Sequence, residues 1–187
     1  MAVRFIRPYH SSNEYVEKYV DMQHYNLDID WNIPVSQFLQ VEGFYLPSRL
    51  KLACAQQMNE ISLWNLSTPQ ERKILAPIID LEYNKDGPPS LIMPRFQPLC
   101  LESESFQQHH DIDKYLDKNG ITRNEWNNFK EQVVEFCDNW ALADEDLLNN
   151  YNNIGFHPCF GIRLLDYGLS TLILENYLKE IKLTGVN

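Results

Sequence analysis

The sequence predicts an α+β fold, in which a small, mostly antiparallel sheet packs on a helical lobe. Apolar runs at residues 76–83 and 91–96 flank the turn-forming segment 84–90 (NKDGPPS), and this order is typical of a β-hairpin. Apolar residues at intervals of three and four between residues 122 and 140 predict a long amphipathic helix. A chain of 187 residues suits one domain and can bury about 70% of its unfolded surface without disulfides or a structural metal.

The first 50 residues carry the weakest pattern. Residues 12–23 fit a helix with Tyr15, Tyr19 and Val20 on its apolar side. Residues 37–45 fit a strand that Gly43 interrupts. The sequence leaves open whether residues 1–42 complete the sheet or form a separate cap.

Two helices are expected in the next segment. In residues 55–66, Met58, Ile61 and the pair Leu63/Trp64 recur at helical spacing with polar residues between them. The sequence Thr68-Pro69-Gln70-Glu71 predicts the start of a second, short helix, because Thr is a good N-cap, Pro suits the first helical position and an acidic side chain favours the first turn.

The long helix at 122–140 has the clearest boundaries. Thr122 and Glu125 have the spacing of a capping box at its start. Its apolar stripe includes Cys137, so this thiol is expected to be buried, and the four cysteines, which form no CxxC pair, are interpreted as free thiols. Before it, residues 111–118 predict a shorter helix that ends at Asn119-Gly120.

The last third of the chain predicts a hairpin and a closing helix. Residues 153–156 and 162–166 flank the turn 157–161 (HPCFG), so the second strand ends at an acidic residue. Residues 169–183 fit a helix whose apolar side includes Leu172, Leu174, Leu178 and Ile181.

Composition limits the partners. Sixteen Lys and Arg against 26 Asp and Glu give a net charge of −10, so a basic surface for nucleic acid is not expected. A basic protein partner fits this charge, and so does an acidic surface that only keeps the protein in solution. No run approaches the roughly 20 apolar residues of a membrane span, and the first residues lack the apolar core of a signal peptide. We expect a cytoplasmic protein without membrane contact, with secretion as an effector left open.

The end of the second hairpin resembles a metal site of the protein-kinase superfamily. Asp166-Tyr167-Gly168, directly after an apolar strand, is similar to the Asp-Phe-Gly sequence whose Asp holds Mg²⁺ against the nucleotide phosphates. Asn153, at the start of the same hairpin, resembles the second metal ligand of that family. The resemblance implies that Asn153 and Asp166 bind Mg²⁺, a cation that prefers oxygen ligands. An ordinary strand-ending turn and a turn-forming Asn are the alternatives.

The catalytic residue of the family fits less well. Its His-Arg-Asp sequence places the Asp five residues before the metal-binding Asn, and here that position is Leu148, with no His-Arg before it. The resemblance implies Asp146 as the group that accepts or orients the attacking hydroxyl, in a loop two residues longer than usual. Asp144 is the alternative, and a solvated acidic loop is the other interpretation.

The resemblance also implies a nucleotide-binding half. Lys51, which alternates with apolar residues in RLKLA, is expected to lie on a strand and to hold the α- and β-phosphates of ATP. Glu60, on the helix at 55–66, is expected to pair with it. Met93, in LIMPRF, is expected near the adenine. A surface lysine on an edge strand is the alternative for Lys51.

Two kinase features are missing. The chain has no Gly-x-Gly-x-x-Gly loop, since Gly43 is the only glycine before Gly87, and only 19 residues follow Gly168. The resemblance is therefore to minimal bacterial effector kinases or to degenerate kinase-like proteins. It implies a single kinase-like domain with an N-lobe over residues 1–98, which carries a helical N-terminal extension, and a reduced C-lobe over residues 99–187.

The expected function is Mg²⁺-dependent phosphoryl transfer from ATP to a protein or small-molecule hydroxyl, achieved mainly by positioning and charge neutralisation. A catalytically inactive pseudokinase-type binding module is the first alternative, because a shared fold does not fix an activity. An acidic inhibitor or immunity-type protein that binds a basic protein partner is the second. Mg²⁺-dependent ATP binding would support the kinase-like site, and its absence would favour the pseudokinase-type module or the acidic inhibitor. The inhibitor also predicts salt-dependent association with a basic partner.

Overall fold

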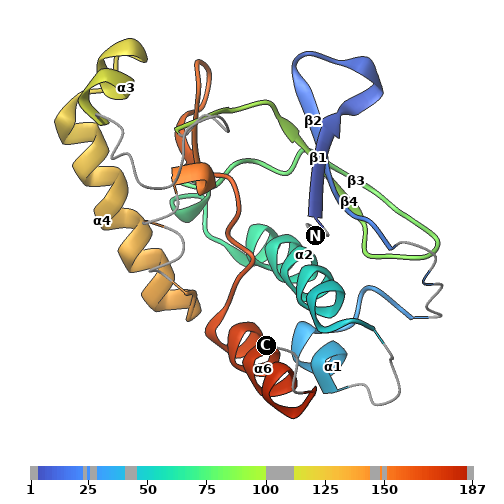
Figure 1. Ribbon diagram of the computed structural model, residues 1–187. Coiled ribbons are helices and arrows are strands. Elements are labelled where there is room, and N and C mark those ends of the chain that lie inside the picture. Colours follow the sequence, from blue (N-terminus) through green and yellow to red (C-terminus); the bar gives the residue numbers. More distant parts are fainter. Residues whose placement is uncertain are drawn as a thin grey trace. The chain divides into compact units, whose positions relative to one another are not determined.

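The computed structural model describes residues 4–22, 25, 29–40, 46–99, 112–143, 148 and 151–184, and it confirms an α+β fold with small antiparallel sheets and several helices (Figure 1). The chain forms two compact units. The first unit comprises residues 1–66, 77–95 and 168–187, and the second comprises residues 67–76 and 96–167. Each unit draws on segments from both sides of residue 98, where the sequence suggested a division.

The first unit contains a four-stranded antiparallel sheet. Its strands are β1 (Arg4–Pro8), β2 (Tyr15–Val20), β3 (Asp80–Glu82) and β4 (Ser90–Pro94), in the order β1-β2-β4-β3. The expected hairpin around residues 84–90 is confirmed as β3 and β4. Strand β2 lies in the middle, where Lys18 stands opposite Ile6 on one side and Leu91 on the other.

The helix predicted at residues 12–23 is wrong, because this segment contains strand β2. The interval of four between Tyr15 and Tyr19 fits a helix, but both residues also fall on one face of a strand, since the interval is even. Residues 16–20 of β2 pair with β1, and its first four residues pair with β4. These long-range partners decide the outcome for a segment whose aromatic and β-branched residues favour strands.

The strand predicted at residues 37–45 is also wrong over the part that the structure describes. Helix α1 (Val35–Gln40) occupies it, and residues 41–45 lie outside the described residues. Phe38 and Leu39 are both buried, at 1% and 8% exposure, and adjacent residues in a strand would face opposite sides. Pro34 precedes the helix, and its carbonyl accepts hydrogen bonds from the amides of Gln37 and Phe38.

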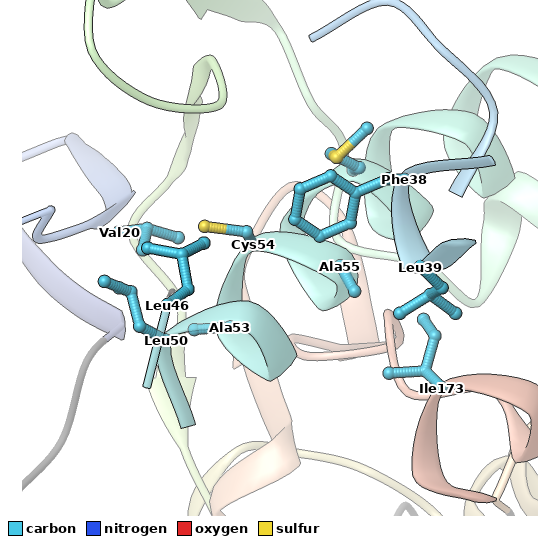
Figure 2. Close-up of a cluster of buried hydrophobic side chains, with 10 residues drawn as sticks. Val20, Phe38, Leu39, Leu46, Leu50, Ala53, Cys54, Ala55 and Ile173 are labelled. Atoms are coloured by element: carbon cyan, nitrogen blue, oxygen red, sulfur yellow. The ribbon is translucent and has the colours of Figure 1, made fainter. Parts of the chain in front are cut away.

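Helix α2 (Ser48–Leu66) includes the helix predicted at 55–66 but begins seven residues earlier. It forms the first unit's apolar core with α1 and with α6 (Thr171–Thr184), which confirms the predicted closing helix. Figure 2 shows Leu50, Cys54, Phe38 and Ile173 in this cluster. The three helices lie together in Figure 1.

The second unit contains α3 (Ile112–Lys118), α4 (Arg123–Trp140) and a three-stranded antiparallel sheet in the order β5-β6-β7. Its strands are β5 (Gln97–Pro98), β6 (Ile154–His157) and β7 (Gly161–Leu164), so the predicted hairpin at 153–166 is confirmed. Two short 3₁₀ helices, η2 (Glu71–Lys73) and η3 (Tyr151–Asn153), complete the unit. Gly120, after α3, has a φ of +66°, a conformation that favours glycine.

The long helix is confirmed with its cap. The backbone amide of Thr122 donates to Glu125 Oε2 at 2.7 Å, and the amide of Glu125 donates to Thr122 Oγ1 at 3.2 Å. The buried side of α4 includes Trp126, Phe129, Val133, Phe136 and Cys137. Thr68 and Glu71 form the same reciprocal pair, although the turn that follows is 3₁₀ rather than α-helical. Among the helices that the structure describes, none is both long and apolar enough to cross a membrane.

Candidate functional site

A buried ionic cluster joins the sheet of the first unit to helix α2. Lys18, on β2, donates from Nζ to both carboxylate oxygens of Glu60, at 2.8 Å to Oε1 and 2.7 Å to Oε2. Arg4, on β1, donates from Nη2 to Glu60 Oε2 at 2.5 Å. The side chains of Lys18 and Glu60 are 4% and 0% exposed, and that of Arg4 is 10% exposed. We call these three residues the Lys18–Glu60–Arg4 cluster.

Gln57 completes the hydrogen bonding around the cluster. It lies one helical turn before Glu60 on the same side of α2. Its Oε1 accepts from Arg4 Nη2 at 3.0 Å, and its Nε2 donates to the carbonyls of Lys18 at 2.8 Å and Pro89 at 3.0 Å. This fully buried amide therefore fixes the position of α2 against β2 and of Arg4 against α2.

Two cations of the cluster share one carboxylate. One carboxylate stands between an ammonium and a guanidinium, so the three groups sum to +1. Buried charges need partners, because removal from water costs several kcal/mol per ion. Glu60 supplies that partner and holds the Lys18 ammonium at a fixed position.

The structure corrects the prediction for Lys51. This residue does not lie on a strand but near the start of α2, and its Nζ pairs with Glu180 Oε1 of α6 at 2.5 Å. The predicted Lys51–Glu60 ion pair is wrong, because the partners of Glu60 are Lys18 and Arg4. Alternating apolar residues around Lys51 also satisfy a helix, since Leu50, Ala53 and Cys54 are buried on one side of it.

Sequence reasoning missed Lys18 and Arg4. The segment YVEKYV around Lys18 is rich in aromatic and β-branched residues, which are typical of strands. That signal could have identified β2 and its lysine. Nothing local to Arg4 indicates its partners, which are more than 50 residues away in the chain.

Met93 lies on the predicted strand, now β4, and its side chain is buried. It stands opposite Val16 of β2, two residues before Lys18. Residues opposite one another in antiparallel strands share a face, and so do residues two apart. Met93 and Lys18 therefore belong to the same face of the sheet, while a contact of Met93 with adenine stays a prediction.

The second unit brings Asn153 and Asp166 to one end of the β6–β7 hairpin. Ile154 pairs with Leu164, and the amide of Leu165 donates to the carbonyl of Asn153 at 2.7 Å. Asp166 is the residue after Leu165, so the pairing of β6 with β7 places both predicted metal ligands at the same end of the hairpin. Their binding of Mg²⁺ stays a prediction.

Tyr167 is fully buried and donates from its hydroxyl to the carbonyl of Ala76 at 3.2 Å.

Gly168, in the first unit, packs against the backbone of α2. A Cβ at this position would lie 2.1 Å from the carbonyl oxygen of Gln56, which is far inside van der Waals contact. The carbonyl of Gly168 accepts a hydrogen bond from Asn59 Nδ2 at 3.0 Å. The glycine of the Asp-Tyr-Gly sequence is thus needed for close packing, whatever the function of the preceding Asp.

The predicted catalytic Asp146 and its alternative, Asp144, lie outside the described residues. Within the described part of the chain, no three His, Cys, Asp or Glu side chains gather as a metal site would require. Comparisons with protein-family models, curated proteins and solved structures gave no match to the chain. The features that bear on function are therefore the Lys18–Glu60–Arg4 cluster of the first unit and the hairpin end with Asn153 and Asp166 in the second.

Proposed function

We propose that the chain is a kinase-like protein that binds ATP with Mg²⁺, in which Lys18 contacts the phosphates and Glu60 positions Lys18. The observation that supports this most is the buried, two-point bond between the Lys18 ammonium and the Glu60 carboxylate. Protein kinases use the same pairing of a strand Lys with a helix Glu to hold the nucleotide phosphates. Lys18 thus takes the role that the sequence suggested for Lys51.

The strand order is compatible with the absence of a glycine-rich loop. In kinases the lysine lies on the third strand, and the glycine-rich loop covers the phosphates. Among the described residues, only β1 precedes the strand of Lys18. The β1–β2 connection contains no glycine, and His10 and Ser11 adopt left-handed backbone with φ of +46° and +61°. We propose that this polar turn stands where kinases have their loop.

In the second unit, Asp166 and Asn153 are the proposed ligands of the Mg²⁺ that accompanies ATP. Carboxylate and amide oxygens suit this cation, which keeps part of its water shell and is held by few protein groups together with phosphate oxygens. The proposed chemistry is phosphoryl transfer to a protein or small-molecule hydroxyl, with Asp146 as the group that orients it.

A second candidate is nucleotide binding without catalysis. The lack of a Gly-x-Gly-x-x-Gly sequence and of a His-Arg before either candidate Asp favours this pseudokinase-type function. The net charge of −10 supports a third, weaker candidate, an acidic inhibitor of a basic protein. Experiments can distinguish the three candidate functions, because only the kinase consumes ATP and the inhibitor does not bind ATP.

Calorimetric titration of ATP into the full chain, with and without Mg²⁺, tests the proposal. We expect Mg²⁺-dependent binding that Asp166→Ala weakens by at least about tenfold, as the loss of a charged ligand contact implies. Asp113→Ala is a matched control, because Asp113 is an exposed aspartate of the same unit that pairs with Arg123. Absence of binding at millimolar ATP would contradict the proposal, and so would equal affinities of the two variants.

A further inference from the structure

The second unit contains a pocket of about 450 Å³ that involves none of the residues assigned above to nucleotide or metal. It is lined by residues of η2, α4 and the β6–β7 hairpin and by the turn after α3. Ligand-binding pockets usually measure roughly 300–1,000 Å³, so it has room for a small organic molecule. The residues that decide its chemistry are Lys73, Asn128, Phe129, Gln132, Phe156 and Arg163.

Arg163 gives the pocket a partly desolvated cation. It lies on β7 and is partly buried, and burial lowers the pKa of its guanidinium. Its Nη1 donates to the carbonyl of Ile162 at 2.7 Å. Within the described chain, no carboxylate lies within ion-pair distance of Arg163, although a buried cation normally has one.

The remaining charges of the lining leave it positive. Lys73, from η2, is exposed and likewise has no ion pair to a described carboxylate. Glu125 is the acidic residue of the lining, and its carboxylate accepts from the amide and hydroxyl of Thr122, both at 2.7 Å. These hydrogen bonds also lower the pKa of Glu125, so it stays charged. The lining therefore sums to +1, in a chain whose net charge is −10.

The pocket also has apolar walls and neutral polar groups. Ile121, Phe129 and Ile162 are buried side chains that line it, and Phe156 is partly buried. Asn128 and Gln132, on the exposed side of α4, add amide donors and acceptors. A cation, amides and an aromatic wall together suit a ligand with an anionic head and a flat apolar body.

We propose that this pocket binds a small monocarboxylate with an aromatic or branched apolar body. The guanidinium of Arg163 would receive the carboxylate through paired N–H donors, a geometry for which its planar fork is suited. Lys73 would add a second positive charge at the mouth, and Phe129 and Phe156 would contact the apolar body. A ligand with one negative charge balances the net charge of +1 of the lining. A phosphate dianion would carry more negative charge than the lining balances, and Glu125 would repel it.

Ligand-observed NMR on the full chain tests the proposal, with phenylacetate as probe and phenylacetamide as its uncharged counterpart. We expect saturable phenylacetate binding with a dissociation constant near or below about 1 mM, and at least about tenfold weaker binding of the amide. Arg163→Gln should weaken phenylacetate binding about tenfold or more, and Lys73→Gln, at an exposed position, should weaken it several-fold. Arg123→Gln, on α4 but outside the pocket, should leave it unchanged.

Three results would overturn the proposal. The first is no phenylacetate binding up to about 10 mM. The second is equal binding of phenylacetate and phenylacetamide, or equal affinities of the wild type and the Lys73→Gln variant. Either result would show that the pocket does not recognise the carboxylate. The third is tighter binding of inorganic phosphate than of phenylacetate, which would replace the monocarboxylate by a phosphate ligand.

Discussion

The Lys18–Glu60–Arg4 cluster makes a quantitative prediction about stability. Glu60→Gln preserves the size of a side chain that is 0% exposed but removes its charge. Three hydrogen bonds from two cations to the carboxylate are weakened or lost, and Lys18 and Arg4 lose the charge of Glu60 while they remain buried. Breaking a buried ion pair from one side costs about 3–5 kcal/mol. That loss is a large part of the 5–15 kcal/mol typical of a folded domain.

Urea denaturation followed by circular dichroism measures this loss as a lower midpoint at an unchanged slope. Glu180→Gln is the matched control, because it also removes one negative charge from an ion pair. Glu180 pairs with Lys51, and its side chain is 28% exposed. Because this pair is more exposed than Lys18–Glu60, its loss should cost less than the loss at Glu60. A loss from Glu60→Gln no larger than the control's would refute the claim that the cluster is buried and mutually dependent.

Further changes test other parts of the structure. Gly168→Ala should destabilise the chain by more than about 1–3 kcal/mol in the same titration, because its Cβ would meet rigid α2 backbone. Trp140→Phe should cost about 1 kcal/mol at pH 7, because the indole donates to Glu71 Oε1 at 2.8 Å. Burial raises the pKa of Glu71, but hydrogen bonds from Thr68 and Trp140 lower it by more, so the net pKa lies below its ordinary value. The stability difference between Trp140→Phe and the wild type should therefore disappear as the pH falls through that lowered pKa. Burial raises the pKa of Cys54 to about 12, so iodoacetamide at pH 8 should label it only after unfolding in urea.

Each of these has a clear contrary result. For Gly168, the control is Gly120→Ala, where no atom lies within 4 Å and only the positive φ of 66° opposes a side chain, so a smaller loss at Gly168 would contradict the packing argument. For Trp140, a stability difference that grows toward low pH would have the wrong sign. For Cys54, labelling as fast as that of the exposed Cys159 in the folded chain would show that the thiol is accessible.

The parts of the fold that the sequence predicted are those with local causes. The helix at 122–140 follows from a sustained apolar stripe and from a capping box between residues three apart. The two hairpins follow from turn-forming residues between apolar runs. In each case the contacts that select the structure lie within a few residues of one another, so the pattern is visible in the chain itself.

The errors concern segments whose structure depends on distant partners. Tyr15 and Tyr19 fit both periods, and only the pairing of β2 with β1 and β4 makes the segment a strand. Phe38 and Leu39 are buried among α2 and α6 residues that no local pattern reveals. The prediction of a strand at Lys51 follows from its alternating apolar neighbours, which equally suit the start of a buried helix.

The same distinction applies to the candidate site. Glu60 is predicted from the resemblance of its helix to the kinase helix whose Glu pairs with a strand Lys. Its partner was not, because Lys18 is 42 residues away and is selected by the position of β2 against α2. Asn153 and Asp166 are predicted from their resemblance to the kinase metal ligands, and the register of the β6–β7 hairpin places them at one end of it. Gly168 shows that a residue of a functional sequence pattern also has a purely structural cause.

The central claim is that Lys18, and not Lys51, is the lysine that binds phosphate. Calorimetric titration of Mg·ATP into Lys18→Met and Lys51→Met tests it most directly, because both variants remove an ion-paired lysine from the first unit and leave the carboxylate in place. Arg4 still neutralises Glu60 in the first variant, so the fold is expected to persist. We expect binding to weaken by about tenfold or more in Lys18→Met and to remain at the wild-type level in Lys51→Met. Equal affinities, or the opposite order, would contradict the account.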